Sequence, residues 1–169
     1  MKRIALIATL VILSASPAFA HAGHGIQSGF MHPFMGGDHL LAMLAVGAWG
    51  ATLGTRGLWA VPVAFVGMMI VGGILGMSGI NVPFVETMIL ASGFVLGGFV
   101  LARVKMPVWS GMLVVGLFAL AHGHAHGAEM PELANPWFYG AGFVAATSLI
   151  HALGAMAALG VMKLQAVKA

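Results

Sequence analysis

The sequence predicts an all-α integral membrane protein, a bundle of about five transmembrane helices that follows a cleaved signal peptide. Of its 169 residues, 60% are hydrophobic and only 7% are charged, whereas a soluble domain carries about a quarter charged residues. The mean hydropathy is +1.02. Such a chain cannot cover a water-facing surface, but it can face lipid. Its 25 glycines suit close helix packing in a membrane, and the absence of cysteine excludes disulfides and thiolate metal sites.

The first 20 residues have the parts of a secretory signal peptide. Two basic residues precede an apolar core, and Ala18-Phe19-Ala20 supplies a small-x-small cleavage site. We therefore expect residues 1–20 to be removed and residues 21–169 to form a single polytopic membrane domain. The alternative is that the signal stays in place as an uncleaved first helix.

Five apolar stretches follow the signal, and each is near the roughly 20 residues that cross the hydrocarbon core of a bilayer. They cover residues 33–53, 58–77, 84–102, 107–126 and 137–162. The breaks between them fall where turn-forming residues cluster, as at 54–57 and 78–83. These stretches are the predicted transmembrane spans.

Basic residues alternate between the predicted loops and indicate the orientation. They follow the first, third and fifth spans, at Arg56, at Arg103 and Lys105, and at Lys163 and Lys168. Because cytoplasmic loops carry the excess of Lys and Arg, we expect the mature N-terminus to lie outside the membrane and the C-terminus to lie in the cytoplasm. The net charge of +3 includes no basic patch with interleaved aromatic residues, so nucleic-acid binding is not predicted.

Ionisable residues gather at the outer end of the fourth span. His122, His124, His126 and Glu129 lie there, in a chain with few charges. Ionisable side chains are costly in lipid and indicate a functional site by default. Residues three, four and seven apart share a helix face, so His122, His126 and Glu129 form one stripe, while His124 is turned away by about 200°.

A second group lies at the outer end of the first span. His32 and His39 align at a spacing of seven, and Met35 and Met43 fall on the same predicted stripe. Asp38 points away from this stripe. It could bind an ion directly, or accept the second N–H of a ligating imidazole on the neighbouring helix.

Four further residues are weaker candidates for metal binding. After cleavage, His21 and His24 would offer two imidazoles beside a free amine that could collect an ion outside the cell. Glu86 opens the third span from the outer side. His151 lies about mid-bilayer in the fifth span, where a single buried histidine could equally serve only to hydrogen-bond a neighbour.

The two outer groups resemble the signatures of the HupE/UreJ family of nickel permeases. The first is His32, five intervening residues and Asp38-His39, and the second is His122-Gly-x-Ala-His-Gly-x-Glu129. The chain departs mildly at Ala121, where the family often has an aromatic residue. The resemblance covers essentially the whole chain. It implies uptake of Ni²⁺ for hydrogenase or urease maturation, with Co²⁺ as the alternative ion and the six residues of both motifs as the functional positions.

Other classes of function stay open at this point. Imidazole and carboxylate ligands do not choose among Ni, Co, Zn, Cu(II) and Fe. A zinc protease helix would need a glutamate base where the chain has Gly123, so we do not expect an enzyme. A non-transporting metal sensor or chaperone subunit is compatible with the sequence. Gly93, Gly97 and Gly98 would permit a homo-oligomer.

Overall fold

The computed structural model describes residues 25–131 and 134–167. All regular structure in these residues is helical, which confirms the predicted all-α class. The elements are α2 (Ile26–Met31), the 3₁₀ turn η1 (His32–Phe34), α3 (Gly37–Thr52), α4 (Thr55–Met77), α5 (Val85–Leu101), α6 (Val108–Ala128) and α7 (Pro136–Val167). The predicted signal peptide, His21 and His24 lie outside the described residues.

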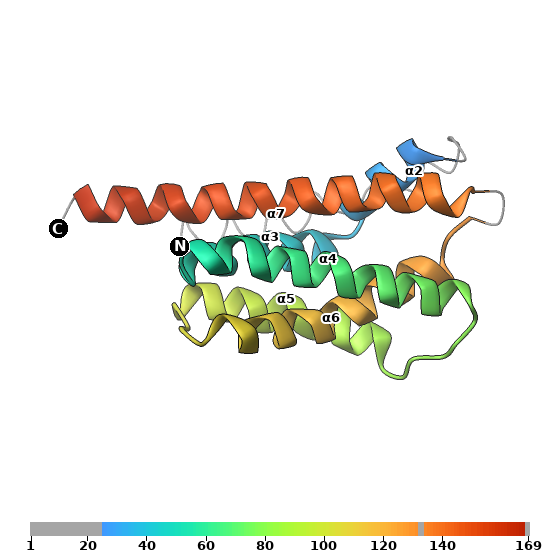
Figure 1. The fold of residues 1–169 in the computed structure, drawn as a ribbon, viewed down its shortest axis with the longest axis horizontal. Helices are drawn as coiled ribbons and strands as arrows, with labels where there is room; N and C mark the ends of the chain where they lie inside the picture. Colours follow the sequence, from blue (N-terminus) through green and yellow to red (C-terminus); the bar gives the residue numbers. More distant parts are fainter. Residues whose placement is uncertain (1–24, 132–133, 168–169) are drawn as a thin grey trace, which may run out of the picture.

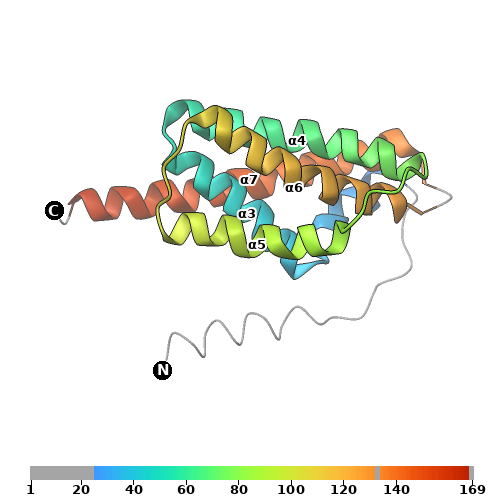
Figure 2. The ribbon, with the colours of Figure 1, turned by 90° about the horizontal axis from the view of Figure 1, so that it is seen from below.

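Helices α3 to α7 run in alternate directions along one long axis (Figures 1 and 2). α4 packs mainly against α6, and α3 packs mainly against α7 and α5. The C-terminal part of α7 projects beyond the other helices. The α3–α4 and α5–α6 connections therefore lie at one end of the bundle, and α6 ends at the other.

Three of the described helices are long and apolar enough to cross a membrane, namely α4, α6 and α7. α5 is a shorter apolar helix of 17 residues, and α3 has 16. At 1.5 Å per residue α3 is about 24 Å long, which is less than the roughly 30 Å of a hydrocarbon core. The count of five spans therefore stays a prediction.

The first predicted span, residues 33–53, is interrupted near its start. η1 ends at Phe34, and α3 begins only after Gly36, which is extended. Pro33 sits at the start of η1, where its missing N–H is tolerated. The predicted methionine stripe is therefore wrong, because Met35 is 58% exposed while Met43 is completely buried.

Glycines bring the backbones of α4 and α6 into direct contact. A Cβ added to Gly123 would overlap the carbonyl oxygen of Met69, and one added to Gly127 would overlap that of Gly73. Gly72 and Gly76 make the reciprocal contacts from α4. Small residues of this kind let membrane helices approach closely, so α6 is held firmly along this face.

A similar pair of glycines joins α3 to α7. A Cβ on Gly47 would overlap the carbonyl oxygen of His151, and one on Gly154 would overlap that of Leu44. This contact fixes the backbone of α7 at the turn that carries His151.

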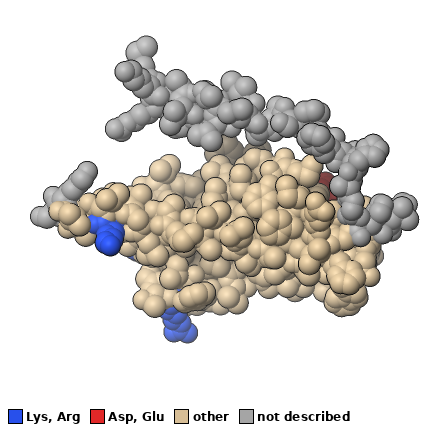
Figure 3. Space-filling view, turned by 90° about the horizontal axis from the view of Figure 1, so that it is seen from above, with Lys and Arg blue, Asp and Glu red and all other residues tan. Residues whose placement is uncertain are grey.

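We call the end of the bundle with Arg56, Arg103 and Lys105 the basic end, and the opposite end, where α6 terminates, the histidine end. On the face drawn in Figure 3, the visible Lys and Arg side chains lie toward the end at which α7 projects. At the basic end the Lys105 ammonium donates a hydrogen bond to the Thr52 carbonyl, and the Trp49 indole donates one to the Val104 carbonyl. These bonds tie the α5–α6 connection to the end of α3.

Candidate metal centre

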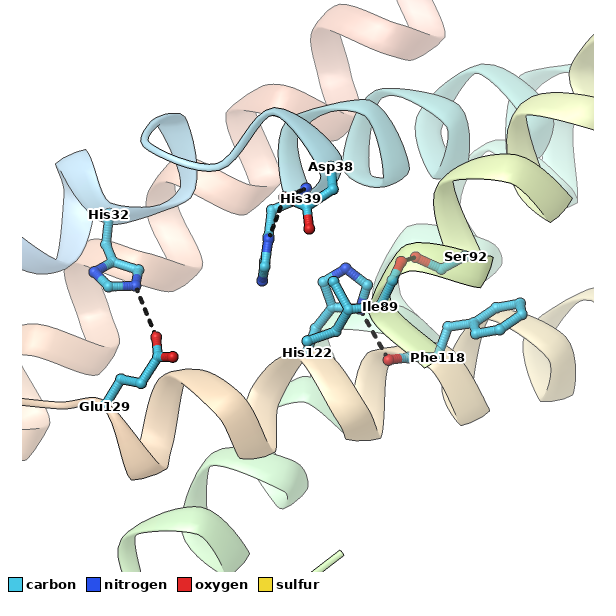
Figure 4. Close-up of polar contacts among 8 residues, drawn as sticks. All are labelled: His32, Asp38, His39, Ile89, Ser92, Phe118, His122 and Glu129. Atoms are coloured by element: carbon cyan, nitrogen blue, oxygen red, sulfur yellow. Dashed lines mark hydrogen bonds and ion pairs between the residues drawn. The ribbon is translucent and has the colours of Figure 1, made fainter. Parts of the chain in front are cut away.

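The structure brings the two predicted groups of ionisable residues together at the histidine end. η1 and the first turn of α3 supply one group, and the last turns of α6 supply the other. His32, His126 and Glu129 each offer a ligand atom, and these three atoms lie within 4.8 Å of one another. The Nε2 atom of His32 is 3.9 Å from a carboxylate oxygen of Glu129 (Figure 4). This spacing suits a shared metal ion.

Four imidazoles form a continuous series that leads from this group into the bundle, and we call it the imidazole row. The ring of His126 lies 4.7 Å from that of His32 and 4.6 Å from that of His39, between centroids. The ring of His39 in turn lies 5.0 Å from that of His122. The row starts at the half-buried His32 and ends at the completely buried His122.

Asp38 orients His39. The Nδ1 atom of His39 donates a hydrogen bond of 2.9 Å to the Asp38 carboxylate, which also accepts a bond from the backbone N–H of His39 (Figure 4). With its proton on Nδ1, this imidazole presents the Nε2 lone pair to a metal. The partner of Asp38 is its sequence neighbour. Of the two roles left open for Asp38, acceptance from an imidazole of a neighbouring helix is therefore wrong, and direct binding of an ion stays a prediction.

His122 has its tautomer fixed in the same way. Its Nδ1 atom lies 3.0 Å from the Phe118 carbonyl oxygen one turn earlier in α6, so Nδ1 is the donor (Figure 4). The Nε2 atoms of His122 and His39 are both buried and find no hydrogen-bond partner in the described part of the chain, and the same holds for both ring nitrogens of His126. Leaving such a group unsatisfied costs about 1–3 kcal/mol. A metal ion bound beside one of these imidazoles would supply the missing partner of a ring nitrogen that accepts.

His32 lies in η1, before the membrane-spanning helices. Burial lowers the pKa of His32 below the ordinary value of 6.5, and the nearby Glu129 carboxylate opposes this shift only in part. His32 is therefore neutral at neutral pH. A neutral imidazole is the form that binds a metal.

Aromatic side chains of α7 cover one side of the imidazole row. The ring of Phe143 lies 4.5 Å from that of His126, and the ring of Tyr139 lies 5.9 Å from that of His32. An apolar cover of this kind excludes water and strengthens ligation by the imidazoles. The sequence reasoning missed both residues, because aromatic residues in an apolar span carry no signal that separates a site wall from ordinary packing.

Three other histidine and acidic positions lie apart from the row. Helical phase predicts that His124 turns away, and its Nε2 atom donates to the Ile80 carbonyl at 2.7 Å, which anchors the α4–α5 connection. Glu86 is exposed in the first turn of α5 and is not part of the group formed by His32, His126 and Glu129. His151 is buried in α7, beside Phe65 of α4.

Comparison with known proteins agrees with the motifs. A family model described as HupE / UreJ protein matches residues 9–169. The chain is 47% identical over 159 residues to Protein HupE of Rhizobium leguminosarum bv. viciae, which covers 91% of this chain and 83% of that protein. No solved structure matches significantly. Since both the family model and the relative extend over nearly the whole chain, this protein belongs to the HupE/UreJ family.

Proposed function

We propose that this protein is a permease that imports Ni²⁺ across the bacterial inner membrane for maturation of a hydrogenase or urease. The observation that carries the proposal is the imidazole row, in which His39, His122 and His126 present buried ring nitrogens without a partner among the described residues. The membership of the HupE/UreJ family supports a nickel cargo. Co²⁺ is the alternative, because nitrogen and oxygen ligands do not by themselves separate the two ions.

The six motif residues take three kinds of role in this proposal. His32, His126 and Glu129 receive the ion at the entrance, where the Glu129 side chain is 62% exposed. His39 and His122 bind it deeper in the bundle, and Asp38 positions His39. Because the centroids of neighbouring rings in the row are only 4.6–5.0 Å apart, the ion can exchange one imidazole ligand for the next. A permease needs such binding, which is favourable but escapable.

The orientation that fits this role places the histidine end in the periplasm. Arg56, Arg103 and Lys105 then lie on the cytoplasmic side, where basic residues are enriched. The mature N-terminus would lie outside, so that His21 and His24 could collect the ion before it reaches His32. The C-terminus would lie in the cytoplasm.

The test is nickel accumulation in a bacterial strain that lacks its other nickel importers. His122→Ala should abolish uptake while the protein still reaches the membrane, because it removes the buried end of the row. His124→Ala is the matched control, since it removes a histidine two residues away that lies off the row, and it should retain uptake. Wild-type uptake by His122→Ala would overturn the proposal.

The same cells can separate the alternatives. Competition of Ni²⁺ uptake by Co²⁺ and Zn²⁺ identifies the preferred ion. A sensor or chaperone subunit would bind the ion but show no accumulation in proteoliposomes, so the absence of accumulation there would exclude a permease.

A further inference from the structure

The line of aromatic rings does not end at His122. The ring of Phe65, in α4, lies 5.6 Å from that of His122 and 5.1 Å from that of His151, between centroids. All three side chains are buried. A series of imidazoles thus runs from His32 at the histidine end to His151 in the middle of α7. Phe65 interrupts this series, because its side chain has no atom that can bind a metal.

We propose that His151, together with Met69 and Thr147, forms a second binding site for the transported divalent metal ion, and that Phe65 separates this inner site from the imidazole row. The inference rests on the proposed function of the row and extends it inward. It assigns the inner site to a relay step, in which the ion leaves His122 and reaches His151 only when the Phe65 ring turns aside.

The inner site is built from two facing helix stripes. Phe65 and Met69 are four residues apart on α4, and Thr147 and His151 are four residues apart on α7, so each pair shares a helix face. The Thr147 hydroxyl donates to the Met69 sulfur at 3.8 Å, and the ring of Phe65 meets that of His151 edge to face. The four side chains are 0–3% exposed.

The imidazole of His151 has no explanation as a simple packing residue. Neither of its ring nitrogens finds a hydrogen-bond partner among residues 25–131 and 134–167. The backbone at this position is held against Gly47, so the ring cannot reach a distant partner by moving the helix. An apolar side chain would fill the same space without the cost of two unsatisfied nitrogens. A metal ion would satisfy one of them.

The donors of the inner site suit a passing transition-metal ion. An imidazole nitrogen, a thioether sulfur and a hydroxyl oxygen are neutral ligands, and the nitrogen and sulfur favour metals such as nickel or cobalt over magnesium or calcium. These donors include no carboxylate, so the inner site should hold the ion more weakly than the entrance with Glu129.

A single introduced thiol tests whether the ion reaches position 151. The natural chain has no cysteine, so His151→Cys gives one thiol whose complex with Co²⁺ has a ligand-to-metal charge-transfer band. Purified protein in lipid nanodiscs is titrated with Co²⁺. We expect the band for His151→Cys and none for the matched variant Leu149→Cys, whose side chain is 45% exposed and is turned about 200° from position 151 on α7. Folded His151→Cys without the band, or equal bands in both variants, would overturn the inner site.

Transport by His151→Ala separates this proposal from the proposed function. We expect uptake to fall by about tenfold or more, while Co²⁺ still binds the imidazole row, as measured by its imidazole-type absorption. If His151→Ala transports normally and His122→Ala does not, the inner site is wrong and the permease stands. If both variants transport normally, the proposed function itself has failed.

The rate at which Co²⁺ reaches position 151 tests whether Phe65 separates the two sites. Both variants are made in the His151→Cys background. Phe65→Leu puts a smaller apolar side chain between His122 and position 151, and Phe65→Trp puts a larger one there. After rapid mixing with Co²⁺, the charge-transfer band should appear faster in the Phe65→Leu protein than in the parent, and slower in the Phe65→Trp protein. Equal rates in the three proteins would remove Phe65 from the proposal.

Discussion

Helix α6 presents two neighbouring faces that are built in opposite ways. One face carries Gly123 and Gly127 and meets α4 so closely that a single added methyl group would overlap a carbonyl oxygen. The other carries His122 and His126 and meets η1 and α3 through imidazole rings. Both pairs have the i, i+4 spacing of one helix face, and they differ by one position in the sequence.

The difference between the faces indicates two separate roles within α6. The glycine face is fully covered by the backbone of α4, so this face has a packing role. The contact on the histidine face buries ring nitrogens of His39, His122 and His126 that lack partners among the described residues, which is costly in an apolar bundle. Rigid contact with α4 on one side holds the imidazoles of the other side in place, so the proposed ligands would be organised before an ion arrives.

Replacing the deepest ligand should separate function from stability most clearly. His122→Leu should abolish Ni²⁺ uptake, while the thermal unfolding temperature stays equal or rises, because an unsatisfied buried nitrogen is removed. Uptake in cells and unfolding of the purified protein are measured together. A strongly destabilised His122→Leu protein would mean that the histidine face also supports the fold.

Weakening the support of a ligand should have a smaller effect. Asp38→Asn keeps an oxygen that can accept the His39 N–H but loses the negative charge, so we expect metal affinity to fall by about 10–100-fold. Asp38→Ala, which removes the acceptor, should lower the affinity further. Equilibrium binding of Co²⁺ measures both. Equal affinities in the wild type and Asp38→Ala would show that His39 is oriented without Asp38.

Disturbing the glycine face should act through stability first. Gly123→Ala places a Cβ against the Met69 carbonyl, and overpacking of this kind costs about 1–3 kcal/mol. Gly97→Ala is the matched control, since a Cβ on this glycine of α5 meets nothing within 4 Å among the described residues. Thermal unfolding compares the two. An unchanged unfolding temperature for Gly123→Ala would show that α4 and α6 can separate freely.

The pH dependence of uptake should be the mildest effect. Burial holds the pKa of His32 below 6.5, so more than half of the His32 side chains are neutral at pH 6.5, and the protonated form prevails only as the outer pH falls further. Uptake at limiting Ni²⁺ should therefore change little above pH 6.5 and decline below it. A decline whose midpoint lies above pH 6.5 would show that His32 is not shielded as the structure indicates.

Local sequence signals predicted the long helices well. The predicted spans 58–77 and 107–126 correspond to α4 and α6 within a few residues, because apolar runs end at turn-forming residues. The first predicted span failed at its start, where η1 and Gly36 break a run that is continuous in hydropathy alone. Hydropathy records which residues tolerate lipid, and it does not record where the backbone changes direction.

The candidate site, like the fold, has parts that the sequence predicted and parts that it did not. The stripe of His122, His126 and Glu129 follows from the period of a single helix, and the structure keeps it. The weaker prediction for Glu86 rested on depth alone, and its side chain lies exposed at the start of α5. Nothing in the sequence marked Phe65, because its importance depends on two histidines that lie more than 50 residues away along the chain.

The sequence by itself determined the class of the protein, its helical character and the two groups of ligand candidates, since composition and helical period are properties of the chain alone. Only the tertiary structure decided that His39 lies between His126 and His122, that Asp38 orients its own neighbour, and that Phe65 lies between His122 and His151. The physical reason is that these contacts depend on which helices meet and how closely. In this protein, pairs of glycines on distant segments set that approach.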